Sequence, residues 1–315
     1  MNKKLFLICV LALSALLLSA CGQQPPEGLV KESPENAATI EAEPQENAAR
    51  SMADTLYFPY ADTALLRRES REITLLPNES REKALVRALL EGSREAGSRA
   101  LFPEKTEVLS TQAQDGMIYI TFNEALYDRY ADEDPDREGA VRRRRLAMDA
   151  LAATLTESGE YRGVQVLVRA EANVGKSMRL TTRFFREEPE TTVPPLVRQS
   201  ASLPTPSAYA DALLTAWQNR SAADLAAFVS AREPWSQASL NTDLADAPAL
   251  LSFAVYDGTV APDGCSAVVC ADLILRDKDG NEYAADACPL PFISEGGAWK
   301  IRRSRLTAMM GESNE

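Results

Sequence analysis

The chain has 315 residues, no histidine, and 46 acidic against 34 basic side chains, a net charge of −12 at pH 7. This acidic balance argues against nucleic acid and against broad contact with anionic lipid headgroups. Without histidine, Ser-His-Asp and Cys-His catalysis and every His-ligated metal site are excluded, whereas hydrolysis by paired carboxylates or a Ser-Lys arrangement stays open. No cofactor or metal is expected, and the length predicts about two domains.

The first residues form a pattern typical of a secretory signal. Lys3 and Lys4 precede an uncharged apolar run over 5–19, which is shorter than the roughly 20 residues that a membrane-spanning helix needs. The run ends at four residues that resemble a bacterial lipobox, Leu18, Ser19, Ala20 and Cys21. In a lipobox the cysteine thiol receives diacylglycerol, and cleavage makes this cysteine the new N-terminus. We therefore expect a lipoprotein signal peptide at 1–20 and a lipidated Cys21; the alternatives are a plain signal peptide and an uncleaved anchor.

Two segments with biased composition divide the rest of the chain. Residues 21–53 are rich in Glu, Pro, Ala, Gln and Asn and carry few large apolar side chains, which predicts a disordered tether. Residues 186–206 contain five prolines, which predicts a semi-rigid linker. Folded domains are therefore expected at 54–185 and 207–310. Removal of residues 1–20 leaves 32 basic and 46 acidic side chains, a net charge of −14.

The first domain has the pattern of alternating strands and helices. In chain order we predict strands at 55–60 and 73–76, a helix that begins after Asn78 and ends at Gly92, a hairpin at Asp115-Gly116, a helix over 139–157 with Val141, Met148, Leu151 and Leu155 buried, and strands at 164–168 and 178–185. In the hairpin, pairing Gln114 with Met117 places Leu109 opposite Phe122, and one face becomes largely apolar. The strand at 164–168 consists almost entirely of apolar residues, which indicates that both of its faces are buried, so we expect it to be central in its sheet.

These pieces resemble a known family. The segments TLYFPYAD, ALVRALLEG followed by ALFPEKTEVLS, DGMIYITFNEAL, ATLTE and VQVLV occur in the order and at roughly the spacing of a GerMN domain, from Asp54 to about Phe185. The resemblance implies an α/β sandwich similar to the ring-building motifs of envelope and sporulation assemblies. It also implies a non-enzymatic role, because the family brings no catalytic residues to carry over. Two departures are Arg142–Arg145, at helix positions that are usually more apolar, and Asn173–Lys176, where the family tends to be shorter.

The second domain begins with two helices and continues as strands. Leu213, Leu214 and Trp217 mark the first helix, and Ser221 caps the second. Four strands are expected, at 251–257, 265–276, 281–293 and 297–306. This order resembles an NTF2-like (SnoaL-like) cone, so the fold class predicted for the whole chain is α+β. A cone would enclose a pocket lined by aromatic residues that otherwise form the core: Trp217, Phe228, Phe253, Tyr256 and Trp299.

Two short motifs resemble ligand-binding loops. Residues 172–177, ANVGKS, end like a phosphate-binding loop, but Ala170 stands where the first glycine belongs, so a hairpin is the better interpretation. Residues 132–138, DEDPDRE, alternate carboxylates as a calcium loop does. Arg137 and Arg143 stand where an EF-hand has Gly and Glu, so an acidic loop before a helix N-terminus fits better.

The run Arg142–Arg145 covers most of the circumference of its predicted helix, which puts Arg144 among the apolar residues. The favoured interpretation is that the aliphatic stem of Arg144 packs while its guanidinium reaches solvent. The alternative is a basic ridge that binds an acidic partner, or the protein's own acidic loop.

Three cysteines remain after Cys9 leaves with the signal and Cys21 is lipidated. A three-residue loop at 278–280 pairs Asp277 with Asn281 and sets Cys270 directly opposite Cys288. Opposed residues lie within disulfide reach, so a Cys270–Cys288 bridge with Cys265 unbridged is one prediction. The other is that all three thiols stay reduced.

These observations predict a lipid-anchored protein on the outer face of the cytoplasmic membrane of a Gram-positive-type spore former. We expect it to act as a non-enzymatic assembly or interaction module of the envelope during sporulation or germination. Its partners would be the membrane, through the diacylglycerol, and an envelope or sporulation protein, which includes a second copy of itself. The alternatives are a carboxylate-dependent peptidoglycan hydrolase, which needs two carboxylates roughly 5–9.5 Å apart in one cleft, and a ligand-sensing lipoprotein that uses the second domain.

Overall fold

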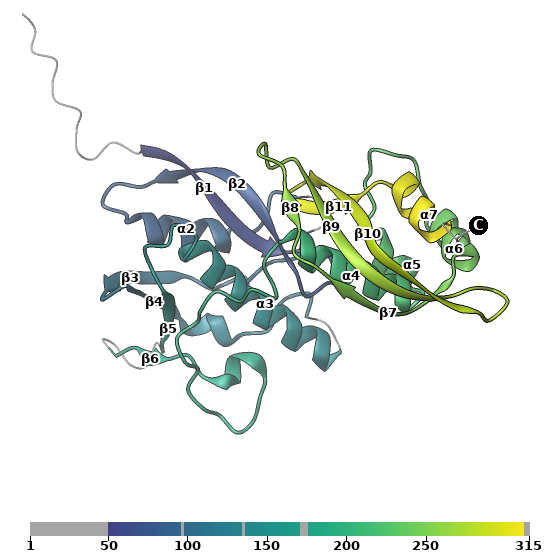
Figure 1. Ribbon diagram of the computed structural model, residues 1–315. Coiled ribbons are helices and arrows are strands. Elements are labelled where there is room, and N and C mark those ends of the chain that lie inside the picture. Colours follow the sequence, from purple (N-terminus) through teal and green to yellow (C-terminus); the bar gives the residue numbers. More distant parts are fainter. Residues whose placement is uncertain (1–49, 96–97, 134–135, 171–175, 312–315) are drawn as a thin grey trace, which may run out of the picture. The chain divides into compact units, whose positions relative to one another are not determined.

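The computed structural model describes residues 50–95, 98–133, 136–170 and 176–311 (Figure 1). They form an α+β fold with three sheets: a two-stranded sheet, a four-stranded sheet in the order β3-β4-β5-β6, and a five-stranded sheet that contains β11-β10-β9-β7. Strand β1 (Arg50–Pro59) pairs antiparallel with β2 (Leu66–Leu75) along its whole length. It begins inside the segment predicted as a tether, because Met52 pairs with Ile73 and packs against the core, a partnership that composition does not reveal.

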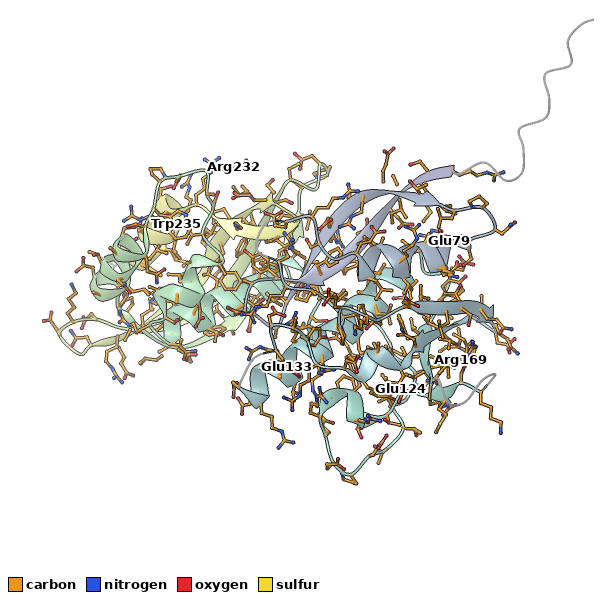
Figure 2. The ribbon with its side chains drawn as sticks, turned by 180° about the vertical axis from the view of Figure 1, so that it is seen from behind. Glu79, Glu124, Glu133, Arg169, Arg232 and Trp235 are labelled. Atoms are coloured by element: carbon orange, nitrogen blue, oxygen red, sulfur yellow. The ribbon has the colours of Figure 1, made fainter. Side chains whose placement is uncertain are left out.

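Helix α2 (Arg81–Leu90) begins at a different residue from the one predicted. Its N-cap is Ser80, whose hydroxyl accepts from the Lys83 amide, whereas Asn78 has a φ of 60° in the preceding turn. Gly92 follows the helix with a φ of 85°, as the predicted helix end requires. Glu79 accepts from Arg87 at 3.0 Å and closes the loop before the helix (Figure 2).

The four-stranded sheet has the predicted hairpin. Strands β3 (Val108–Gln114) and β4 (Met117–Asn123) pair Gln114 with Met117, and Asp115 and Gly116 both have positive φ. A bulge sets Val108 rather than Leu109 opposite Phe122, so the end of the predicted register is wrong. Strand β5 (Gly163–Arg169) runs parallel to β4 and also pairs with β6 (Met178–Arg179), which confirms its central place.

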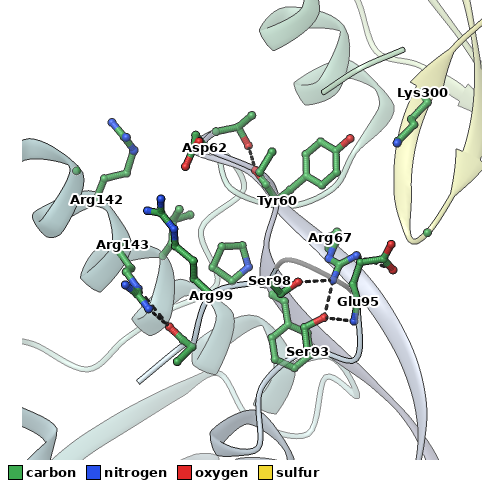
Figure 3. Close-up of a pocket in the computed structure, with 18 of the residues that line it drawn as sticks. Tyr60, Asp62, Arg67, Ser93, Glu95, Ser98, Arg99, Arg142, Arg143 and Lys300 are labelled. Atoms are coloured by element: carbon green, nitrogen blue, oxygen red, sulfur yellow. Dashed lines mark hydrogen bonds and ion pairs between the residues drawn. The ribbon is translucent and has the colours of Figure 1, made fainter. Parts of the chain in front are cut away.

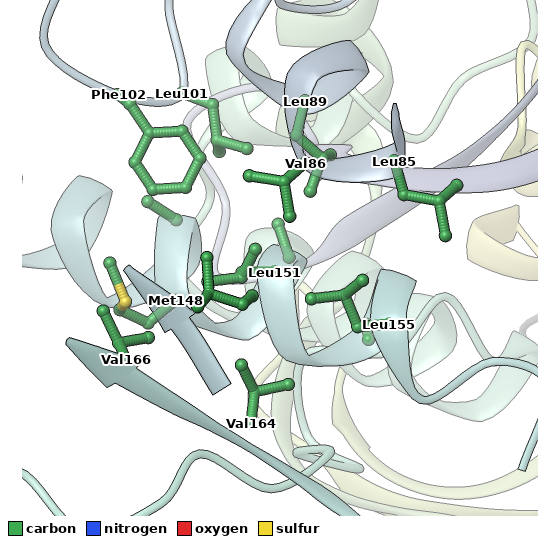
Figure 4. Packing of buried hydrophobic residues seen from close by; sticks show 14 of the residues in the cluster. Leu85, Val86, Leu89, Leu101, Phe102, Met148, Leu151, Leu155, Val164 and Val166 are labelled. Carbon is green, nitrogen blue, oxygen red and sulfur yellow. The ribbon is translucent and has the colours of Figure 1, made fainter. Parts of the chain in front are cut away.

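Helix α3 (Arg137–Leu155) packs on this sheet and buries Met148, Leu151 and Leu155 as predicted, while Val141 is only partly buried. The predicted strand 178–185 is wrong beyond Arg179. The chain turns there into a 3₁₀ helix, η3 (Thr182–Phe185), which buries Phe184 in the first core. Another 3₁₀ helix, η2 (Glu124–Tyr127), follows β4. Figure 4 shows the middle of the first core, where α2, α3 and β5 meet.

The proline-rich segment lies against the first core. Leu196 exchanges backbone hydrogen bonds with Val164, and the Arg198 guanidinium donates to the Ala153 carbonyl and the Tyr57 hydroxyl. The segment predicted as a linker is therefore tied to α3 and β1, and composition alone could not show these tertiary hydrogen bonds.

Residues 206–311 form helices and one antiparallel sheet around a second core. The elements are α4 (Pro206–Gln218), α5 (Ala222–Ala226), α6 (Gln237–Asp246), β7 (Ala249–Val255), β8 (Thr259–Val260), β9 (Ser266–Arg276), β10 (Glu282–Glu295), β11 (Ala298–Ile301) and α7 (Arg303–Gly311). Ser221 caps α5 as predicted, whereas α6 and α7 were not predicted, and the strand expected over 297–306 ends at Ile301. Helices followed by an antiparallel sheet fit the expected order; the NTF2-like assignment stays a prediction.

The hairpin of β9 and β10 corrects the predicted cysteine register. Asp277 and Asn281 flank the expected loop, and Tyr283 lies opposite Leu275. A bulge then follows, because the Ala287 amide donates to the Asp272 carboxylate at 2.7 Å and Ala287 takes a positive φ. Beyond the bulge Cys288 pairs with Ala271 and Cys270 with Pro289, so the register that supported a Cys270–Cys288 bridge is wrong.

Candidate functional site

A pocket of about 480 Å³ lies where the β1–β2 turn, the segment 93–100, the N-terminal half of α3 and the β10–β11 turn come together (Figure 3). Its apolar floor includes Phe58, Pro59 and Leu146. Its charged residues are five cations and three carboxylates: Arg67, Arg99, Arg142, Arg143, Lys300, Asp62, Glu95 and Glu295. A concave, mixed apolar and charged site of this volume can hold a small organic molecule.

Arg67 binds Ser93, Glu95 and Ser98 beside the pocket. Its side chain is almost fully buried and reaches the Glu95 carboxylate at 3.1 Å and the Ser98 hydroxyl at 3.1 Å, with Ser93 as a further acceptor. Ser93 in turn donates to Glu69 at 2.6 Å. Burial raises the pKa of Glu69, but the hydrogen bonds from Ser93 and Arg71 outweigh it and hold that pKa below its usual range. Arg67, Ser93 and Glu69 thus form one hydrogen-bonded network.

Arg143 connects α3 to the opposite lip of the pocket. Its guanidinium donates to the Ala100 carbonyl at 2.7 Å and to the Asp132 carboxylate at 2.9 Å, and it stacks 3.8 Å from the centre of the Tyr130 ring. Burial raises the pKa of Asp132, but the hydrogen bond and charge of Arg143, with a contribution from Arg99, lower it overall.

Glu295 and Lys300 close the pocket from the β10–β11 turn. Glu295 accepts from the Ser230 hydroxyl at 2.6 Å and the Ala231 amide at 3.0 Å, and Lys300 lies 3.8 Å away. Burial raises the pKa of Glu295, but the two hydrogen bonds and the charges of Lys300 and Arg232 lower it overall. This carboxylate is therefore ionised at neutral pH.

Backbone contacts hold the turn against the edge of β2. The Arg68 amide donates to the Gly297 carbonyl at 3.0 Å, and the Leu66 amide donates to the Ser202 carbonyl at 2.8 Å. A Cβ on Gly297 would lie 1.6 Å from the Arg68 carbonyl oxygen, so only glycine permits this approach. Beside it, the Tyr209 hydroxyl donates to the Leu66 carbonyl at 2.9 Å, and Tyr60 packs in the second core.

The arginine run has a different arrangement from the favoured prediction. Arg144 is completely buried: its guanidinium lies over the Tyr130 and Phe184 rings and donates to the Asp128 carbonyl at 2.7 Å and to Glu133 at 3.3 Å. Its head does not reach solvent, because aromatic faces and the acidic loop take the place of water. Of the alternative, a basic ridge for an acidic partner or for the protein's own acidic loop, the structure shows the pairing with the loop, through Arg143–Asp132 and Arg144–Glu133, but Arg144 is not exposed as a ridge residue would be.

The other predicted site residues are scattered. Trp217 and Phe228 are core residues, Trp299 donates to the Pro204 carbonyl, and Tyr256 is exposed, so the five aromatics do not line one pocket. Asp136, at the end of the acidic loop, caps α3. Within the described residues no group of three or more His, Cys, Asp and Glu side chains is placed to hold a metal ion. Residues 171–175, most of the phosphate-loop-like motif, and the lipobox with Cys21 lie outside the described residues.

The comparisons with known proteins assign the first half of the chain. Residues 55–172 match the family model Germane, described as sporulation and spore germination. The match supports a GerMN domain in this half. A comparison with curated proteins finds no match. No helix in the described part of the chain is long and apolar enough to cross a membrane.

Solved structures with some likeness include two of the sporulation protein GerM from Bacillus subtilis. Its first GerMN domain is 18% identical, with a TM-score of 0.31, over 47% of this chain and 98% of that one. Its tandem GerMN domains are 15% identical, with a TM-score of 0.27, over 45% of this chain and 49% of that one. A SEC-C motif containing protein from Rhodopseudomonas palustris is 15% identical, with a TM-score of 0.28, over 34% of this chain and 80% of that one. These scores are too low to carry an inference.

The GerMN domain contributes a second feature, the face of its sheet opposite the first core. Ile118, Ile120 and Val166 point into the core, so Tyr119 and Leu167 lie on the other face, where both are half-buried. Tyr119 pairs with Gln165 on β5 and with Gln112 on β3, and Gln112 is exposed. Gln165 and Thr121 on the same face are buried, so part of this face is covered by the chain itself. The exposed remainder combines aromatic, aliphatic and polar side chains, as many interfaces do.

Sequence reasoning missed the pocket. Its charged residues come from four segments that are far apart in the chain, and the first and second halves both contribute. The one available signal was the pair Arg67-Arg68 within a strand, since arginine is rarely placed inside a sheet without a partner.

Proposed function

We propose that this protein is a lipid-anchored envelope protein that acts as a non-enzymatic assembly module during sporulation or spore germination. The observation that carries the proposal is the match of residues 55–172 to a family described by those two processes. The lipobox-like residues Leu18, Ser19, Ala20 and Cys21 support anchoring at the outer face of the cytoplasmic membrane.

We place the partner, a second envelope or sporulation protein or another copy of this chain, at the partly exposed residues on the face of the GerMN sheet opposite the first core. Tyr119 supplies an amphipathic ring of the kind that dominates interface energetics. Leu167 on β5 lies diagonally from it, opposite Thr121, and Gln112 on β3 supplies a polar rim. An enzyme would need converging catalytic groups, whereas an assembly module needs only such a face.

Tyr119→Lys tests this placement. The charged side chain should abolish co-purification of envelope partners from sporulating cells and reduce the yield of germination-competent spores. The matched control is Tyr256→Lys, because Tyr256 is an exposed tyrosine beside the sheet of the second half. Both variants should keep the wild-type thermal unfolding midpoint within a few degrees. Equal partner recovery in the two variants would contradict the use of this face.

Cys21→Ala tests the anchor separately. Only a diacylated cysteine is processed by the lipoprotein route, so the variant should accumulate as an uncleaved or mislocalised precursor. Globomycin should produce the same precursor from the unaltered chain. Normal processing of the variant would identify an ordinary secreted protein instead.

The hydrolase alternative finds less support in the pocket. A glycosidase-type general acid needs a carboxyl group with a raised pKa. Glu295 has a lowered pKa, and Glu95 is paired with Arg67 at 3.1 Å. These two carboxylates are arranged to hold the neighbouring segments in place rather than to donate a proton.

A further inference from the structure

The pocket carries an excess of positive charge in a strongly acidic protein. Five arginine and lysine side chains line it against three carboxylates, while the whole chain has a net charge of −12. Three of the cations come together on one side: Figure 3 shows Arg99, Arg142 and Arg143 along the same wall. A local reversal of sign inside a concave site attracts anions and concentrates them there.

The internal ion pairs leave two of these cations available. Arg67 is paired with Glu95, Lys300 with Glu295 and Arg143 with Asp132. Arg99 and Arg142 are exposed, and in the described ranges neither makes a hydrogen bond or an ion pair; Arg99 only attracts Asp132 at longer range. Neither guanidinium is consumed by the fold.

The number and geometry of these groups select the anion. A carboxylate carries one charge and is satisfied by one bidentate arginine, whereas a phosphate monoester carries about −1.5 to −2 at neutral pH and has three acceptor oxygens. Arg99 and Arg142 together with the partly neutralised Arg143 match the second. Gly139, in the first turn of α3, lines the same wall, and the positive end of the helix dipole adds to the attraction.

The remaining lining residues of the pocket indicate which organic group would carry the phosphate. A phosphate ion would fill only a small part of about 480 Å³. Beyond the arginine wall the polar lining includes the Asp62 carboxylate, together with the hydroxyls of Thr63 and Ser98, which bond to Tyr60 and Arg67. Sugar or polyol hydroxyl groups donate to such acceptors, and the floor of Pro59 and Leu146 accepts the carbon face of a ring.

We propose that this pocket binds a phosphorylated sugar or polyol, with the phosphate monoester on Arg99 and Arg142, the charge of Arg143 adding to the attraction, and the hydroxyl groups toward Asp62. This site is separate from the sheet face of the assembly function, since none of its lining residues lies on that face. Loss of one function therefore leaves the other measurable.

Isothermal titration of the purified full chain in detergent, with glucose 6-phosphate as the probe, tests the proposal. Saturable binding is expected, and Arg142→Gln should weaken it about tenfold or more, since a charge-assisted hydrogen bond contributes on the order of 1.5–3 kcal/mol. The matched control is Arg305→Gln, which removes an exposed arginine from α7 and should leave the affinity unchanged. Arg99→Gln serves as a second variant, and thermal unfolding checks that all variants fold.

Two further arms identify the ligand class. Asp62→Asn should weaken glucose 6-phosphate but leave inorganic phosphate unaffected, because only the sugar reaches Asp62. Dimethyl phosphate, a monoanionic diester like those of lipids and wall polymers, should bind at least tenfold more weakly than the monoester. Absence of saturable binding by the unaltered chain, equal losses in Arg142→Gln and Arg305→Gln, or equal binding of the diester would overturn the proposal.

Discussion

The two halves of the molecule bury different kinds of side chain. The GerMN half buries the arginines Arg67, Arg71 and Arg144, whereas among the described residues of 206–311 the only buried polar side chain is that of Ser230. The buried arginines bind the ends of elements and the loops beside them: Arg71 donates to the Ala88 carbonyl in the last turn of α2 and to the Gly92 carbonyl just after it. The first half therefore fixes its loops with buried charge, and the second half relies on apolar packing.

The largest difference between the two halves should appear in the free energy of unfolding when a buried arginine is removed. Arg144→Ala would leave Glu133 and the Asp128 carbonyl without their donor and should lower the free energy of unfolding by about 3–5 kcal/mol. Arg276→Ala in the second half removes an even shorter pair with Glu282, at 2.6 Å, but both side chains are about half exposed, so the loss should stay below about 1 kcal/mol. Urea unfolding of both variants measures the difference. Equal losses would mean that burial of the pair is not what stabilises the first half.

The junction of the halves can be tested at glycine positions. Gly297→Ala forces a Cβ into the Arg68 carbonyl, while Gly280→Ala, also at positive φ, meets open space. In both variants the left-handed backbone should lower the free energy of unfolding by about 1–2 kcal/mol. Only in Gly297→Ala does the clash lower it by a further ~1–3 kcal/mol. We expect the extra loss in Gly297→Ala to appear as increased hydrogen exchange at the Arg68 amide. Unchanged protection of that amide would show that the contact with β2 does not hold the turn.

The smallest expected effect concerns the pH dependence of stability. Burial raises the pKa of Asp149 on α3, against the weaker opposing effects of Ser202 and Arg145. A raised carboxyl pKa costs stability above the native pKa and nothing below the ordinary value of 3.8, so Asp149→Asn should stabilise at pH 7 but not at pH 3.

Asp277 in the second half gives the opposite sign. The side-chain and backbone hydrogen bonds of Asn281 lower its pKa, so its contribution to stability is present above 3.8 and is lost as pH falls through the native value. Asp277→Asn should therefore destabilise at pH 7. Thermal unfolding of both variants between pH 3 and 7 checks the signs, and a common sign would refute this interpretation of the two sites.

Local signals in the sequence predicted elements but not the irregularities between them. The hairpin at Asp115-Gly116 was predictable because two residues of positive φ determine the turn. The bulge at Ala287 was not, because a carboxylate on the neighbouring strand, Asp272, stabilises it. That single hydrogen bond shifts the register by one residue and separates Cys270 from Cys288. Register depends on tertiary partners that hydrophobic alternation does not contain.

The same limit applies to the candidate site. The acidic loop and the arginine run were both visible in the sequence, and their pairing followed once α3 was in place. The pocket needs contacts between segments as distant as Arg67 and Lys300, and no spacing rule connects them. The buried state of Arg144 was also hidden, because the aromatic faces that enclose it come from Tyr130 and Phe184 on separate elements.

Site-specific photo-cross-linking in sporulating cells tests the central claim most directly. A photoreactive phenylalanine analogue replaces Tyr119 on the GerMN sheet in one strain and Tyr256 in the second half in another. The account predicts a discrete cross-linked partner, or a dimer of this chain, from position 119 and only diffuse background from position 256. A discrete product from position 256 with none from position 119 would contradict it.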